Sequence, residues 1–211
     1  MLALFPLETV VYPSESLPLH IFEKRYQELI FDCEEHGILF GIPTYINRRL
    51  EYGTEVRLKK KVNTQSNGEC DVVCIGTRVF KINSFYNQLP DKLYAGGEVE
   101  YFKDDTTSDA GLQKEVQYQI EKLYTELNLD RTPVFTVPFF SYQVAHKIGL
   151  ALSQEYQLLK IRKEINRLQY ILGHLKTTIP IVKEMNRTRR VIEMNGHFKN
   201  FDPLDFEDFK F

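Results

Sequence analysis

Five histidines are the first residues to consider as metal ligands or as a general base. They stand at positions 20, 36, 146, 174 and 197, and no two of them are spaced to share one turn of a helix. A zinc site or an HExxH-type protease needs such a pair, because two ligands must reach one ion from the same face. The sequence therefore predicts no metal site. His20 is interpreted as a structural histidine that precedes a helix.

Carboxylates and nucleophiles offer no better active site. Asp104–Asp105 and the pair Asp202/Asp205 lie in polar stretches, where nothing would desolvate a carboxylate and raise its pKa. No serine has the glycine context of a nucleophile elbow, and no glycine is followed by lysine as in a phosphate-binding loop. We expect a chain without catalytic residues and without a cofactor. A small hydrolase stays open as a third hypothesis, since missing motifs argue only weakly against an enzyme.

Basic clusters at 57–61, 160–167 and 187–190 are candidates for contact with phosphate groups. The first cluster alternates with apolar residues as a strand does, and it places Arg57, Lys59 and Lys61 on the outer face together with Glu55. These three basic residues are the candidate nucleic-acid-binding residues. Surface strands also carry lysine to prevent edge pairing, so a solvated face is the competing interpretation.

The segment VFTVPFFSY, residues 134–142, is apolar where a connection between helices is usually polar. It either wedges between two parts of the fold or lines a groove for peptides, which requires apolar surface that solvent can reach. The candidate peptide-binding residues are Phe135, Phe139, Phe140 and Tyr142.

Composition and charge set the class of protein. The chain has 211 residues, a formal net charge of −2 and three cysteines, Cys33, Cys70 and Cys74, without metal-type spacing. We expect a soluble globular protein with buried thiols in a reducing compartment. The N-terminus lacks a basic segment and carries Glu8 within its apolar run, and no apolar run approaches the ~18 residues of a membrane span. The sequence therefore predicts a cytoplasmic protein without a membrane partner.

The first half of the chain has the pattern of a β domain with one helix. Within residues 12–36, two prolines favour an extended segment, and a helix follows. Its apolar stripe is Phe22, Tyr26, Leu29, Ile30 and Cys33. Strands are expected around it at 2–12, 38–46, 54–63, 69–85 and 93–102, with Gly41 and Pro43 marking an edge or a bend and Gly76 a bulge. We predict a small β barrel over residues 1–105.

The apolar period changes from 2 to 3.6 after residue 105, which predicts a helical subdomain over residues 106–192. Ser108 or Asp109 is the expected N-cap of its first long helix. A later seam repeats at three and four residues and indicates a packed bundle or, less simply, self-pairing; it comprises Ile165, Leu168, Leu172, Leu175, Ile179 and Val182. Pro180 predicts a kink or a restart of that helix. Residues 193–211 form an acidic, phenylalanine-rich tail that either folds back or offers anchors to a partner.

The N-terminal run LFPLETVVYPSESLPLHIFEKRY resembles the opening of the Lon protease N-terminal domain family, in the order LFPL, VVxxP and PLxIFExRY. The likeness continues through Gly53–Thr54, residues 71–82 (DVVCIGTRVFKI), Val99–Glu100 and the helical piece at 141–172, and it covers roughly residues 2–180. The family reads Gly-x-x-Arg where this chain has Gly-Thr-Arg. The shift moves the basic residue to the opposite face of a strand, so no role is carried over to it.

The resemblance implies an α+β protein: a PUA-like pseudo-barrel with one inserted helix, followed by a C-terminal helical bundle. It also implies a non-catalytic module that recognises unfolded or client proteins and peptides. We expect such a module to work with a separate ATP-dependent protease, because the sequence shows neither the ATPase nor the Ser-Lys proteolytic module of Lon proteases. The alternative is an RNA-binding PUA-like protein.

Overall fold

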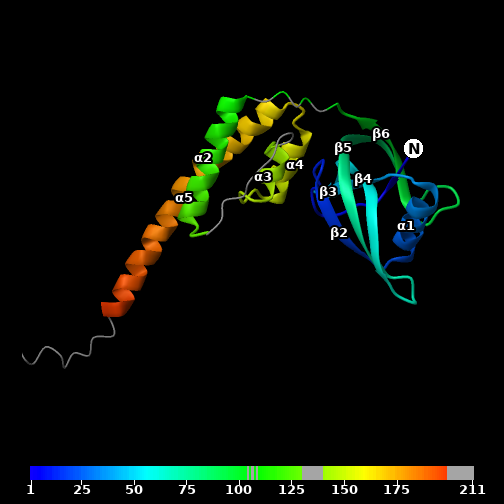
Figure 1. Cartoon of the computed structure of the whole chain (residues 1–211), viewed down its shortest axis with the longest axis horizontal. Helices are drawn as coiled ribbons and strands as arrows, with labels where there is room; N and C mark the ends of the chain where they lie inside the picture. The colour runs from blue at the N-terminus through cyan, green and yellow to red at the C-terminus, as the bar shows by residue number, and fades with distance from the viewer. Residues whose placement is uncertain (104, 106, 108, 130–139, 199–211) are drawn as a thin grey trace, which may run out of the picture.

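The computed structural model describes residues 1–103, 105, 107, 109–129 and 140–198. Strands fill the first half of this part of the chain, and long helices fill the second (Figure 1). The strands are β1 (Leu2–Leu4), β2 (Ser16–Ile21), β3 (Phe40–Ile46), β4 (Arg49–Thr64), β5 (Cys70–Tyr86) and β6 (Ala95–Tyr101). They form one sheet in the order β2-β5-β4-β3-β1-β6, and β5 also pairs with β6, which closes the barrel. The predicted α+β class is confirmed.

Helix α1 (Lys24–His36) lies against the barrel and ends at Gly37, whose φ of 64° is left-handed. Tyr26, Leu29, Ile30 and Cys33 are buried, as the apolar stripe predicts. Phe22 is an error in that prediction. It precedes the helix, is 60% exposed, and lies beside the His20 ring.

Strand β3 is not an edge strand, because it lies between β1 and β4. Its register shifts between Pro43 and Tyr45, so the alternative of a bend is the correct one. The bulge expected near Gly76 is present as well: Glu55 pairs with Arg78 but Val56 pairs with Gly76, which leaves one extra residue in β5.

Gly76 also holds the turn that follows Tyr12. Its carbonyl accepts a hydrogen bond from Ser14 N–H at 2.9 Å, and its own N–H donates to the Glu15 carbonyl at 2.9 Å. A Cβ on Gly76 would lie far inside contact distance of the Tyr12 carbonyl oxygen. Only glycine therefore lets this turn approach β5 so closely.

The helices are α2 (Ala110–Glu126), α3 (Phe140–Ala145), α4 (Leu152–Lys160) and α5 (Glu164–Phe198). The Asp109 carboxylate accepts hydrogen bonds from two N–H groups of the first turn of α2, which confirms it as the N-cap. Helix α2 packs along α5, and the predicted seam faces it, with Leu168 and Leu175 fully buried. The seam thus serves the packed bundle.

Helix α5 does not restart at Pro180, which lies inside it. Pro180 and Lys176 are both exposed, so water can bind the Lys176 carbonyl that has lost its helical partner. The helix also runs to Phe198, beyond residue 193, where the tail was expected to begin. The predicted subdomain boundary at residue 105 stays a prediction.

A fully buried ion pair joins the start of α5 to α3. The Arg167 guanidinium is 0% exposed and donates to the Glu164 carboxylate at 2.8 Å. It also donates to the Ile161 and Arg162 carbonyls, and the Glu164 carboxylate in turn accepts from the Ser141 N–H and hydroxyl. All buried side-chain polar atoms among the described residues have a hydrogen-bond partner. The network fixes the chain around Ser141 to α5.

Candidate protein-binding surface

Helix α5 continues past the end of the helix that supports it. The Asn186 side-chain amide donates a hydrogen bond to the carbonyl of Glu126, the last residue of α2. The following residues of α5, 187–198, project beyond α2 (Figure 1). The last turns of α5 therefore carry side chains that α2 does not cover.

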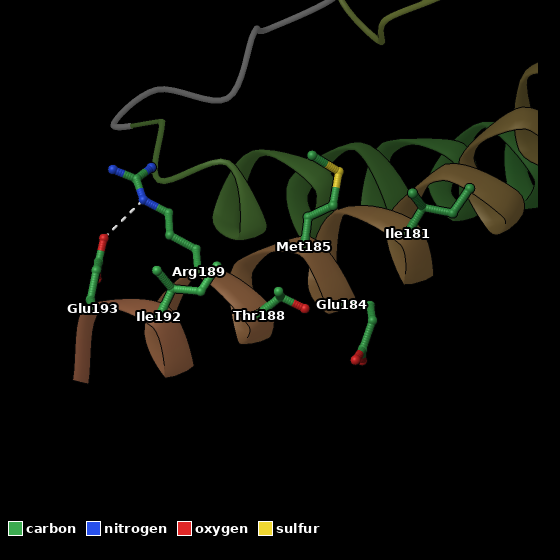
Figure 2. Close-up of a pocket in the computed structure, with 7 residues that line it drawn as sticks. All are labelled: Ile181, Glu184, Met185, Thr188, Arg189, Ile192 and Glu193. Carbon is green, nitrogen blue, oxygen red and sulfur yellow. Dashed lines mark hydrogen bonds and ion pairs between the residues drawn. The ribbon is translucent and has the colours of Figure 1, made fainter. Parts of the chain in front are cut away.

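An apolar groove lies along residues 181–193 of α5, from beside α2 to beyond its end (Figure 2). Ile181, Met185, Thr188 and Ile192 follow one another at three and four residues and so share one face of the helix. The side chains of Ile181, Met185 and Ile192 are 61%, 66% and 65% exposed. The groove has a volume of about 730 Å³. Apolar side chains exposed side by side in this way are typical of an interaction site.

Charged side chains at the rim give the groove a small excess of negative charge. Glu184, Arg189 and Glu193 complete its lining. Arg189 Nε donates to Glu193 at 2.9 Å, whereas Glu184 lies 3.9 Å from Arg187, and all four side chains are well exposed. Exposed ion pairs of this kind are weak, so their charged groups can exchange partners. The lining can therefore supply apolar contact and a carboxylate for a cation.

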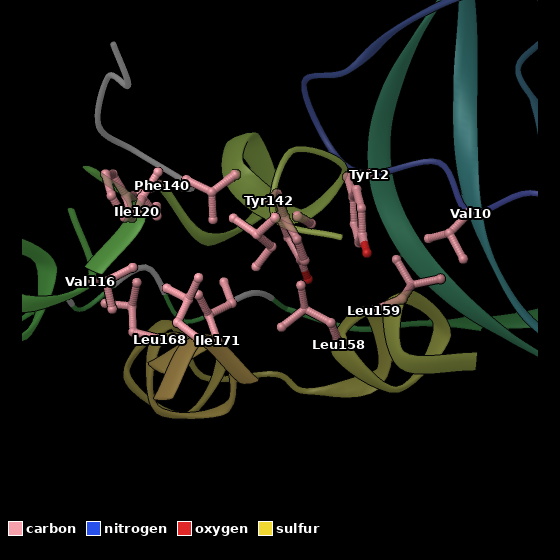
Figure 3. Packing of buried hydrophobic residues seen from close by; sticks show 14 of the residues in the cluster. Val10, Tyr12, Val116, Ile120, Phe140, Tyr142, Leu158, Leu159, Leu168 and Ile171 are labelled. Atoms are coloured by element: carbon pink, nitrogen blue, oxygen red, sulfur yellow. The ribbon is translucent and has the colours of Figure 1, made fainter. Parts of the chain in front are cut away.

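The predicted aromatic site lies elsewhere. Phe140 and Tyr142 are buried, with exposures of 7% and 3%, in the cluster that joins the barrel to the helices (Figure 3). Tyr142 stacks on Tyr12 at 5.0 Å between ring centroids. Phe135 and Phe139 lie outside the described residues. The two described rings form the wedge that was the competing interpretation, and neither presents apolar surface to a peptide.

The predicted nucleic-acid residues stay on the barrel surface. Arg57 and Lys59 are exposed on β4. Lys61 is half-buried and donates to Glu34 at 2.8 Å, a hydrogen bond that raises the pKa of its ammonium group. Register shifts in β4 break the even alternation that was expected of these residues.

Glu55 is the residue of β4 that the sequence placed wrongly. It was predicted on the outer face, but its side chain is 3% exposed. Arg78 donates to it at 2.8 Å and the Tyr101 hydroxyl at 2.5 Å. Burial alone would raise the pKa of this carboxyl, and the hydrogen bonds from Arg78, Tyr101 and Thr77 outweigh burial and lower it. Arg78, to which no role was assigned, is thus the partner of a buried carboxylate.

His146 links the barrel to the helices. Its Nδ1 lies 2.7 Å from the Glu155 carboxylate on α4, and its Nε2 lies 3.3 Å from Glu15 in the turn after Tyr12. Burial lowers the pKa of His146, but the two carboxylates raise it to about 9. Sequence spacing gives no sign of this contact, because Glu15 and His146 are far apart along the chain. No group of residues able to hold a metal ion occurs within the described part of the chain.

Known proteins with a similar sequence or fold include Lon N-terminal domains. The family model of the ATP-dependent protease La (LON) substrate-binding domain matches residues 1–177. The crystal structure of a Lon N-terminal domain protein from Xanthomonas campestris is similar, with 26% sequence identity and a TM-score of 0.65 over 82% of this chain and 96% of that one. None of the curated proteins compared with the chain matches it.

A second structure, the N-terminal domain of the Mycobacterium avium complex Lon protease, shares 14% identity and supports the fold alone. Its TM-score is 0.62, over 83% of this chain and 97% of that one. Among the described residues, no helix is both long enough and apolar enough to cross a membrane. The matched family model is that of a substrate-binding domain rather than of a catalytic one. With that model covering most of its length, the chain belongs to the Lon substrate-binding domain family.

Proposed function

We propose that the chain recognises client proteins by binding their apolar segments in the groove of α5. The observation that carries the proposal is the row of three exposed apolar side chains, Ile181, Met185 and Ile192, on a helix face that no other described element covers. The family description names substrate binding and so supports a binding role for the chain, but its match ends at residue 177, so the groove itself rests on the exposed apolar row. The role is binding without catalysis.

The shape and charge of the groove favour one kind of segment. A groove along a single helix suits an amphipathic helix that inserts apolar residues at i, i+3, i+4 and i+7. The carboxylates of Glu184 and Glu193 favour lysine or arginine beside those apolar residues. Each apolar side chain that becomes fully buried contributes about 1.5–3 kcal/mol, and ordering of the client offsets part of it. We expect dissociation constants in the micromolar range.

The wider role in the proposal is that of an adaptor. A module that binds clients without cleaving them would present them to a separate ATP-dependent protease in the cytoplasm. The groove lies at the far end of α5 from the barrel, which leaves the barrel surface available for a second partner (Figure 1). Co-purification followed by mass spectrometry would identify both kinds of partner.

Fluorescence anisotropy with two labelled probes tests the groove. One probe is a designed amphipathic peptide with leucine and lysine, and the other is reduced, carboxymethylated α-lactalbumin, which cannot fold. Ile181→Ser combined with Ile192→Ser should weaken binding of both at least about tenfold. Lys183→Ser is the matched control, because Lys183 is exposed on another face of the same helix. Equal binding by the groove variant and the control would contradict the proposal.

An RNA-binding barrel is the second proposal, and the exposure of Arg57 and Lys59 on one strand favours it. Contacts with phosphate would make the affinity for a single-stranded oligonucleotide fall steeply with salt. Lys59→Glu should abolish that binding and leave binding to the groove unchanged. Oligonucleotide binding that does not depend on salt or on Lys59 would exclude this surface.

A further inference from the structure

A second pocket, about 440 Å³ in volume, lies where the β3–β4 hairpin meets α4. The hairpin turns at Asn47 and Arg48, whose φ angles of 51° and 61° give the tight twisted turn that joins antiparallel strands. Helix α4 contributes residues at i, i+3, i+4 and i+7, which form one face. The lining comprises Ile46, Asn47, Arg49, Glu51, Ser153, Tyr156, Gln157 and Lys160. It shares no residue with the groove of α5.

Hydrogen-bond donors dominate this lining. Arg49 brings one positive charge to the lining from the barrel, and Lys160 brings another from α4. Two amides and a hydroxyl, from Asn47, Gln157 and Ser153, can donate beside them. Glu51 is the one acidic residue of the lining. Five donor groups around one space match an anion with several oxygens better than a single carboxylate or a halide.

The two cations are positioned differently. The Lys160 ammonium lies 4.9 Å from the centroid of the Tyr156 ring and 5.9 Å from that of Tyr52, so two aromatic faces hold it at the pocket wall. Arg49 lies 3.5 Å from Glu51, and their side chains are 75% and 46% exposed. Such an exposed pair is weak, and an incoming anion can displace the carboxylate from the guanidinium. The guanidinium fork then matches two oxygens of a phosphoryl group.

We propose that this pocket binds a phosphorylated small molecule, with its phosphoryl group between Arg49 and Lys160. Inorganic phosphate alone would fill only a small part of a space of this size, which lies in the range of small-molecule sites. Ile46 and Tyr156 supply apolar wall for the remainder of the ligand. The ligand connects the barrel to α4, so its binding favours the docked arrangement of the two parts.

Isothermal titration of the full chain with adenosine 5′-monophosphate, inorganic phosphate and adenosine tests the proposal. We expect the nucleotide to bind best, phosphate to bind more weakly and adenosine not to bind at about 10 mM. Arg49→Gln and Lys160→Gln should each weaken nucleotide binding about tenfold, since each removes a charged hydrogen-bond donor. Glu51→Gln should strengthen it about threefold, because it removes the competing carboxylate. General damage to the fold could not weaken nucleotide binding in two variants and strengthen it in the third.

Arg48→Gln is the matched control, because Arg48 is an exposed neighbour of equal charge that does not line the pocket. It should leave the affinity within about twofold. Absence of nucleotide binding overturns the proposal, and so does an equal loss in the Arg48 and Arg49 variants, which would indicate unspecific attraction. Phosphate binding as tight as that of the nucleotide would overturn the small-molecule part and leave a site for free phosphate.

Discussion

Replacing Arg167 by methionine should destabilise the helical part severely, although methionine is apolar and similar in length. The guanidinium is fully buried and donates to Glu164, to the Tyr142 hydroxyl and to two backbone carbonyls. Methionine would leave the Glu164 carboxylate in the core without its cation. A buried charge that loses its partner costs about 3–5 kcal/mol.

A double-mutant cycle separates the charge from the packing. Glu164→Leu alone strands the Arg167 charge and should also cost about 3–5 kcal/mol. The double variant Glu164→Leu/Arg167→Met removes both charges, and its remaining cost is that of the carbonyls and the Ser141 groups left without partners. We expect the double variant to lose at least about 2 kcal/mol less than the sum of the two single variants.

Urea unfolding followed by circular dichroism at 222 nm measures the free energy of unfolding of each variant. Lys163→Met is the control, because it removes an exposed charge next to the network and should change the free energy by less than about 0.5 kcal/mol. Additive losses from the two single variants would refute the reasoning. So would a loss below about 1 kcal/mol for Arg167→Met, since the ion pair would then not be desolvated.

Three further predictions concern the barrel and its junction with the helices. Gly76→Ala should cost more than about 2 kcal/mol in urea unfolding, because the new Cβ would force the Tyr12 carbonyl away from β5. The pKa of His146 is raised from 6.5 to about 9 when folded, so the stability that it contributes is complete below pH 6.5 and is lost as the pH rises through about 9. His146→Gln should remove that loss from a pH series of unfolding midpoints, and an unchanged series would exclude the histidine as its source. Phe22→Ser should change the unfolding midpoint little, whereas Tyr26→Ser should lower it strongly, since Phe22 is 60% exposed and Tyr26 only 6%.

Local signals predicted those features that depend on neighbouring residues. The N-cap at Asp109 and the bulge near Gly76 are confirmed, because both carry a local sequence signal: a capping side chain in one case and a glycine that interrupts an alternating strand in the other. Phe22 fits the apolar period of α1, yet the helix begins two residues after it, at Lys24. Periodicity locates a helix better than it locates its ends.

Features that depend on pairing between distant segments could not be predicted. Glu55 lies beside the bulge in β5 and is covered by Arg78 of β5 and Tyr101 of β6, so its burial depends on residues far along the chain. The groove of α5 was not predicted, although Ile181, Met185 and Ile192 follow one another at helical spacing beside the predicted seam. Ile181 and Met185 precede the contact between Asn186 and Glu126 and are still exposed, so which stripe is covered depends on how α2 and α5 face one another.

Because α5 extends beyond the end of α2, the two ends of the groove differ in helix stability. Beyond Asn186, α5 has no packed neighbour in α2, and an isolated helical stretch as short as residues 187–198 is only marginally stable in water. The turn that carries Ile192 should therefore fray and re-form rapidly, while the turn that carries Ile181 keeps its α2 support. A client that contacts both turns would hold the end of α5 in its helical form. The free-energy cost of ordering those residues would lower its affinity.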